Sequence, residues 1–238
     1  MREMPYKVEV GRLALASMLM NGLEAFLLPM KNRNKKGNSE AAKGHEIFGY
    51  IFGTRHVDPV ARRCTYKVEF INFDATARTS PDSVEYEPDA QNIKSAILSL
   101  VAPKMQLLGT IHTHPYRLLK TEEKTYSGEV GSYMYTPSGA DEDASGAMEY
   151  QLDLILTVVN TRRKLTHGTC YAEKNCKFCL RFDLDNIRFF LGAYVRGQGP
   201  DFRYVPYADV HLKQPAGLGI KARELDIPDE LKERHMKI

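Results

Sequence analysis

The apolar positions along the chain follow two periods, which separate the predicted helices from the predicted strands. Residues 10–22 carry apolar side chains at helical spacing with few helix breakers, so we predict a helix there. Residues 89–101 begin with an acidic residue, place apolar side chains at positions i, i+3, i+4 and i+7, and end before Pro103, which predicts a second helix. Residues 29–45 are polar, basic and glycine-bearing, and we expect an exposed loop there, including the basic run 31–37.

Shorter runs that are rich in β-branched and aromatic residues predict strands. They cover residues 46–57, 64–76, 105–114, 152–160 and 177–195, and the last run is long enough for one strand or two. Residues 137–150 are typical of a turn that opens into a short helix. This order of elements predicts a mixed α/β fold in which helices pack against a mixed β-sheet.

The chain divides into one predicted domain, residues 1–197, and a C-terminal extension, residues 198–238. We expect the extension to be a loosely packed, extended arm with a short exposed helix over residues 223–237. Within it, residues 201–215 could add a strand to this sheet or to a partner. Inside the domain, residues 116–136 show no settled period, which predicts a long loop or lid.

Composition narrows the classes of partner. The chain is 43% hydrophobic and 26% charged, and 33 basic against 30 acidic residues leave a net charge of only +3. That balance argues against nucleic acid or an anionic membrane as the main partner. We find neither an apolar run of about 18 residues nor the apolar segment of a signal peptide, and we expect a cytoplasmic protein. Its four cysteines should then be thiols or metal ligands.

Two histidines at the end of a predicted strand are the first chemical signal. His112 and His114 are two residues apart, so a strand places both imidazoles on one face, where they can grip one zinc ion. A catalytic zinc site needs a third protein ligand, and Asp141, at the start of a predicted helix, is a natural candidate. Taken alone, the pair could also be two hydrogen-bonded histidines at a strand end.

A metal-dependent hydrolase also needs a general base and a donor for the oxyanion. Glu46 leads a predicted strand whose glycines permit close approach of neighbouring backbone. Ser138 lies three residues before Asp141 and is a hydroxyl donor at the same turn, a position where it could equally cap the helix.

Three short motifs follow one another along the chain: Glu46-x-x-Gly49-x-x-x-Gly53, then His112-x-His114-Pro115, then Pro137-Ser138-x-x-Asp141. Each motif alone is a weak signal, but the three together, in this order and on matching elements, are specific. They resemble the JAMM (MPN-plus) zinc metallopeptidase family, and the resemblance covers roughly residues 8–195. The compact form would fit a prokaryotic, bacterial member of the family.

The resemblance implies a cytidine-deaminase-like MPN fold and a role for each matching residue. His112, His114 and Asp141 would bind zinc together with a water. Glu46 would be the general base and Ser138 the oxyanion donor. Family members commonly cut isopeptide or peptide bonds after the C-terminal glycine of ubiquitin or a ubiquitin-like protein, which would make this protein a deubiquitinase-like isopeptidase.

One departure from the family concerns the third ligand. The family's gap between the second histidine and the Pro-Ser segment is short, whereas residues 116–136 add about fifteen residues here. Asp143 is therefore an alternative ligand. We prefer Asp141, because its spacing from Ser138 keeps serine and aspartate on one helical face.

The cysteines form a second candidate cluster. His167, Cys170, Cys176 and Cys179 have a spacing that could close a structural zinc site, or they could be unrelated side chains on a hairpin. Cys64 is typical of a buried strand residue.

Two other functions compete with the isopeptidase hypothesis. One is peptidase chemistry at the same site on a sulfur-carrier protein or on a phage or cell-wall peptide. The other is a non-catalytic MPN scaffold, and such scaffolds usually lose the metal ligands.

Overall fold

The computed structural model describes residues 6–28, 30–33, 39–42, 44–79, 84–85, 88–116, 135–139, 141, 152–160, 168–171, 178–184, 186–196, 204–206 and 209–212. Within these residues the protein is a mixed α/β fold with two helices, α1 (Arg12–Leu27) and α2 (Pro88–Val101). The strands are β1 (Tyr6–Val10), β2 (Met30–Arg33), β3 (Ser39–Ala42), β4 (Phe48–Asp58), β5 (Arg63–Phe73), β6 (Arg78–Thr79), β7 (Val84–Glu85), β8 (Gln106–Tyr116), β9 (Leu152–Asn160), β10 (Gly168–Tyr171), β11 (Cys179–Leu184), β12 (Ile187–Arg196), β13 (Tyr204–Pro206) and β14 (Asp209–Leu212).

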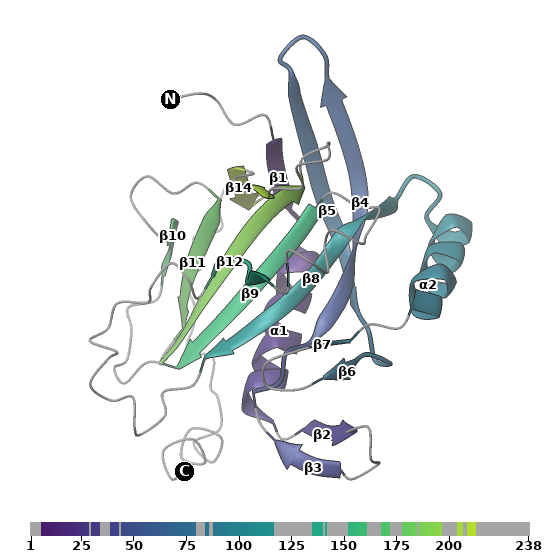
Figure 1. Cartoon of the computed structure of the whole chain (residues 1–238). Helices are drawn as coiled ribbons and strands as arrows, with labels where there is room; N and C mark the ends of the chain where they lie inside the picture. The colour runs from purple at the N-terminus through teal and green to yellow at the C-terminus, as the bar shows by residue number, and fades with distance from the viewer. Residues whose placement is uncertain are drawn as a thin grey trace.

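One large mixed sheet organises the molecule (Figure 1). Its strand order is β10-β11-β12-β9-β8-β4-β5-β1-β14, and β13 pairs with β12. The pairs β8–β9, β1–β5 and β1–β14 are parallel and the others are antiparallel. The sheet curls so far that residues of β14 lie near β11 and β12. The β8–β9 pair lies near the middle of the sheet.

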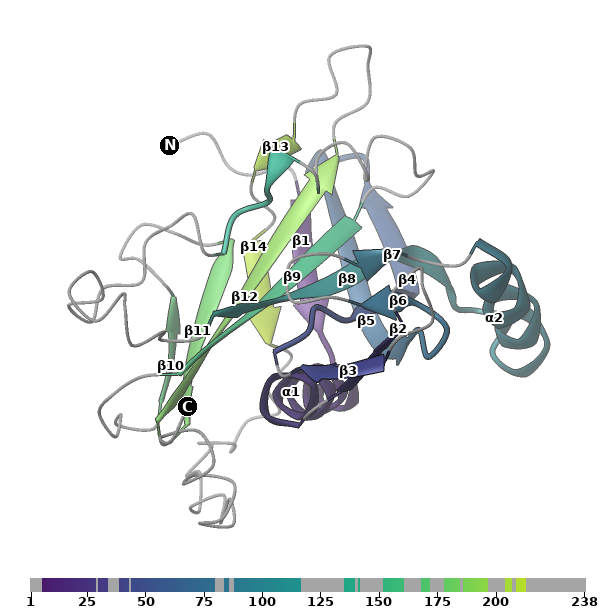
Figure 2. The ribbon, with the colours of Figure 1, turned by 60° about the horizontal axis from the view of Figure 1, so that its bottom comes forward.

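Helix α1 packs against one face of the sheet and builds the main core (Figure 2). Met18 and Phe26 are buried against strand residues such as Ile111 and Leu156. The helix runs to Leu27, five residues beyond the predicted end, because apolar side chains continue at helical spacing through residues 25–27, which are all buried.

Helix α2 lies beside β4 and β8 and matches its predicted range (Figure 1). It contributes Leu98 to a small cluster with Phe48 and Phe52 on the face of the sheet opposite the main core. Lys94 fixes the helix, because its Nζ lies 3.6 Å from Asp74 Oδ1 and 5.2 Å from the centre of the Tyr50 ring. Neither helix in the described part of the chain is long and apolar enough to cross a membrane.

Several strands lie where the sequence predicted something else. Residues 29–45 were predicted to form a loop, yet they contain the β2–β3 hairpin. β1 and β10 were not predicted, because both are short and polar residues interrupt them. The predicted arm contributes β13 and β14 to the protein's own sheet, which is one of the two alternatives given for residues 201–215. The predicted helix over 223–237 lies outside the described residues.

Gly109 is required by the close approach of β8 and β9. A Cβ atom added there would collide with the backbone carbonyl of Leu152, which cannot move without disturbing the parallel pair. We expect Gly109→Ala to cost about 3 kcal/mol of unfolding free energy, a fall in Tm of roughly 6–12 °C. Gly139→Ala is the control, because a Cβ atom there meets nothing within 4 Å. Equal Tm values for the two variants would contradict this account.

Candidate metal centre

Strand β8 brings the two histidines to one face of the sheet. Ile111 and Thr113 point to the other face, where Ile111 enters the main core. His112 and His114 are only 6% and 7% exposed, and their ring centres lie 4.9 Å apart. The alternation of the strand therefore delivers a buried imidazole pair, as the sequence predicted.

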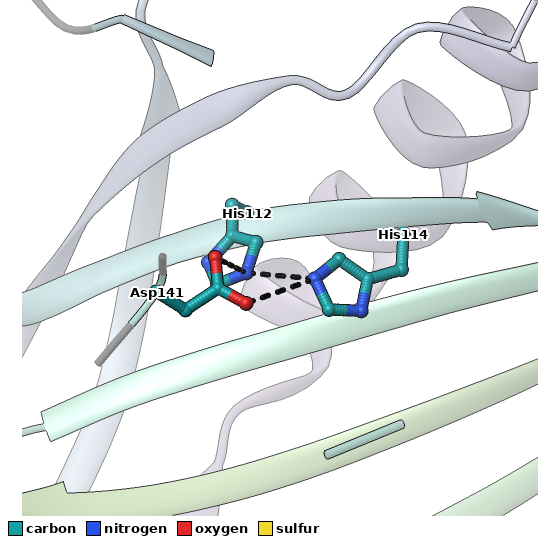
Figure 3. A group of neighbouring side chains, drawn as sticks. All are labelled: His112, His114 and Asp141. Carbon is teal, nitrogen blue, oxygen red and sulfur yellow. Dashed lines mark hydrogen bonds and ion pairs between the residues drawn. The ribbon is translucent and has the colours of Figure 1, made fainter. Parts of the chain in front are cut away.

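Asp141 completes the group from a separate segment (Figure 3). Tyr135 anchors the start of this segment, since its ring is buried and stacked on Phe190, with centroids 5.2 Å apart, and its carbonyl accepts a hydrogen bond from the Tyr194 hydroxyl. Six residues later the half-buried Asp141 carboxylate reaches the histidines.

Ser138 and Asp141 hold each other in a reciprocal cap. The Ser138 N–H donates to Asp141 Oδ2 at 2.7 Å, and the Asp141 N–H donates to Ser138 Oγ at 3.2 Å. This is the geometry of a capping box, in which the first and fourth residues satisfy each other's backbone donors. Ser138 is exposed, and Asp143 lies outside the described residues.

We expect Ser138→Ala to weaken metal binding, because the cap fixes the Asp141 carboxylate. Loss of a side-chain cap costs about 1 kcal/mol, which is about a fivefold rise in metal Kd if it falls on the bound geometry. Competition against a chromophoric chelator measures the Kd. Ser138→Thr keeps the hydroxyl and should bind as the wild type does. An unchanged Kd in Ser138→Ala would show that the cap does not position Asp141.

The three donor groups have the spacing of metal ligands. His112 Nε2 lies 3.1 Å from His114 Nε2 and 3.2 Å from Asp141 Oδ1, and His114 Nε2 lies 3.4 Å from Asp141 Oδ2. In a tetrahedral zinc site with bonds of about 2.0–2.1 Å, neighbouring ligand atoms lie about 3.3–3.4 Å apart. The buried His112–His114–Asp141 group can therefore hold a metal ion with one coordination position left open.

Contacts between the histidines and nearby carboxylates shift the pKa values of His112 and Asp141. Burial by itself would lower the pKa of His112, but the contacts with Asp141 and Asp153 outweigh it and raise the pKa to about 10. Burial would likewise raise the pKa of Asp141, but His112 and His114 hold it well below its usual range. The group thus stabilises one positive charge beside the carboxylate, which suits a bound cation.

Glu46 lies next to the histidine strand. Phe48 pairs with His112, and one residue earlier Ile47 exchanges contacts with Thr113: the Thr113 N–H donates to Ile47 O at 3.0 Å, and the Ile47 N–H donates to Thr113 Oγ1 at 2.9 Å. Continuing this register places the half-buried Glu46 opposite His114, on the face that carries both imidazoles.

Asp153 and Thr110 also belong to this site, and the sequence prediction missed them. Asp153 Oδ1 lies 3.8 Å from His112 Nδ1 and accepts a hydrogen bond from Thr110 Oγ1 at 3.1 Å. A signal was available, because Asp153 is the one charged residue in the apolar run Leu152–Asn160. A carboxylate inside a buried strand calls for a partner.

The structure describes only part of the predicted cysteine cluster. Cys179 is a buried thiol in a small core cluster with Tyr135, Val159 and Phe190, and Cys170 pairs with Arg181, two residues from Cys179. His167 and Cys176 lie outside the described residues, so the second zinc site stays a prediction. Cys64 is buried in β5, as predicted.

The segment between His114 and Asp141 is described only at its ends. Strand β8 continues to Tyr116, and the chain is described again from Tyr135. The predicted lid over residues 116–136 therefore falls mostly outside the described residues.

No family model matches the chain, and no curated protein is significantly similar to it.

Proposed function

We propose that this protein is a zinc-dependent amide hydrolase of the JAMM (MPN-plus) type. Its proposed substrate is the peptide or isopeptide bond after the C-terminal glycine of ubiquitin or a ubiquitin-like protein. The observation that carries the proposal is the spacing of the His112, His114 and Asp141 donor atoms, all within 4.8 Å of one another. Glu46, two residues before strand β4, adds a carboxylate beside the histidine strand. Two imidazoles, one carboxylate and one open position are the donor set of catalytic zinc.

Two separate parts of the fold supply the three proposed zinc ligands. The imidazoles come from a rigid central strand, and the carboxylate comes from a capped turn, so two independent parts of the fold set the geometry. When bound, the metal would lower the pKa of a water and polarise the scissile carbonyl.

Glu46 is the proposed general base. A carboxylate at the position opposite His114 would lie on the same face as the ligands and would take the proton from the attacking water. The same carboxyl group would then give that proton to the leaving amine. Thr113 supports this role, because its two hydrogen bonds with Ile47 hold Ile47 against strand β8. Glu46 is the residue just before Ile47, so it is kept close to the same strand.

Ser138 is the proposed oxyanion donor. Its Oγ already accepts the Asp141 N–H, and a hydroxyl group that accepts in this way keeps its own hydrogen free to donate. Because Ser138 is exposed beside the half-buried Asp141, a substrate carbonyl can approach it from solvent. Stabilisation of the tetrahedral oxyanion by one such donor is worth a large rate factor.

The proposed substrate class rests on the resemblance and on the burial of the two histidines. Both histidines are more than nine-tenths buried, so a scissile bond reaches them most easily when its neighbours carry no side chains. The C-terminal Gly-Gly of a ubiquitin-like protein meets that requirement as an extended strand. The protein to which the ubiquitin-like protein is attached would lie on the other side of the scissile bond, joined through the leaving amine.

Metal content tests the proposal directly. Elemental analysis of the wild type should give one zinc per chain, and His114→Ala should give none; two falling to one would add the cysteine site. Cleavage of a ubiquitin-like fusion is then assayed with the zinc-loaded wild type. A wild type that holds no zinc after reloading, or that holds zinc but cleaves neither peptide nor isopeptide fusions, would contradict the proposed function.

A further inference from the structure

We propose that Asp153 is a positioning residue that fixes the orientation and tautomer of His112, so that His112 Nε2 is presented to the metal. The inference rests on the proposed function only in requiring a metal at this site. It concerns a carboxylate on β9, outside the motifs that resemble the family.

Asp153 is a buried carboxylate. The residue is 6% exposed inside an apolar strand, where an ionised carboxylate is strongly destabilising unless other groups contact it. Two side chains on the adjacent parallel strand β8 contact its Oδ1. Thr110, its register partner, donates a hydrogen bond of 3.1 Å, and His112 Nδ1 lies at an ion-pair distance of 3.8 Å.

The two nitrogens of His112 face different groups. Nε2 faces His114 and Asp141 at 3.1 Å and 3.2 Å, whereas Nδ1 faces Asp153. A neutral imidazole carries its proton on only one nitrogen. A carboxylate on the Nδ1 side favours that proton on Nδ1, which leaves the Nε2 lone pair for the metal.

Thr110 holds the Asp153 carboxylate. Its hydroxyl donates to the same oxygen that faces His112, so it holds the carboxylate in place. Thr110 and His112 are two residues apart on β8 and lie on the same face. The contacts from Thr110 to Asp153 and from Asp153 to His112 therefore fix the His112 ring from its Nδ1 side, the side away from the metal. Carboxylates and other hydrogen-bonding groups commonly orient metal-bound histidines in this way.

The test measures metal affinity and does not depend on cleavage. Zn²⁺ and Co²⁺ Kd values are measured for the full chain by competition with a chromophoric chelator, together with Tm without metal. Asp153→Asn keeps the shape but can present an N–H to Nδ1, which favours the wrong tautomer, and its Kd should rise about 10- to 100-fold. Thr110→Val should raise the Kd about threefold or more, and Thr110→Ser should restore it by keeping the hydroxyl group.

Asp183 provides a matched control. It is 8% exposed on β11 and is paired with Arg188 at 2.7 Å and with Arg181 at 3.4 Å. Asp183→Asn therefore removes an equally buried strand carboxylate and should lower Tm without changing the metal Kd by more than about twofold. A general loss of stability would affect both variants alike.

The outcomes separate this inference from the proposed function. If Asp153→Asn binds metal within about threefold of Asp183→Asn, the inference is overturned and the proposed function stands. If Asp153→Asn does not fold, an unchanged Kd in Thr110→Val overturns the inference. A wild type that binds metal with the expected pattern of variants, but cleaves no fusion, supports the inference and contradicts the proposed function. A wild type that binds no metal overturns both.

Discussion

Glu46→Gln is expected to keep its zinc and to lose cleavage by a factor of about 10²–10⁴. Glutamine preserves the shape of the side chain but cannot accept the proton of the attacking water. Because Glu46 is not among the three grouped ligands, metal content should not change. The measurement is the cleavage rate of a ubiquitin-like fusion at equal metal loading.

Glu24→Gln is the control for this substitution. Glu24 is exposed on α1, which packs against the opposite face of the sheet, so the same chemical change there should leave the rate unaltered. Undiminished cleavage by Glu46→Gln would exclude Glu46 as the base. Loss of zinc in that variant would instead make Glu46 a ligand.

Removal of the metal is expected to abolish cleavage completely. A chelator should bring the rate to background, and one equivalent of Zn²⁺ should restore it, because without the metal the water keeps its high pKa and the scissile carbonyl is not polarised. The same treatment should lower Tm, since a ligand that binds only the folded state at 100 times its Kd stabilises that state by about 2.7 kcal/mol. Rate and Tm are followed in one titration.

His112→Asn supplies the control for reconstitution. This variant lacks one of the three donors, so added Zn²⁺ should restore neither its rate nor its Tm at concentrations that suffice for the wild type. Cleavage that survives exhaustive chelation would contradict a metal-dependent reaction. Equal recovery of His112→Asn would show that the metal acts elsewhere.

The sequence predicted the part of the site whose geometry is local. Strand alternation places His112 and His114 on one face, and the sequence made Ser138, three residues before Asp141, a candidate helix cap, which the structure shows as a reciprocal cap with Asp141. The strands near the middle of the sheet were also predictable, since β4, β8 and β9 are apolar and bounded by polar turns.

The residues that were missed depend on strand pairing. Asp153 becomes part of the site only because β9 lies parallel to β8 with Thr110 opposite Asp153. No local pattern gives that register. β1 was missed for a similar reason, because a short polar strand forms when a neighbouring strand satisfies its backbone groups, and periodicity does not report the neighbour.

The pairing of β1 with β14 affects how the chain can be made. During synthesis β1 emerges about 200 residues before its outer partner, since the pair joins Lys7 to Asp209. Until β14 arrives, one side of β1 presents unpaired N–H and C=O groups, the kind of edge on which strands of other chains add. A parallel contact of such long sequence separation is also slow to form. Pairing with β14 therefore closes a border of the sheet that stays open to strand addition while the chain is being made.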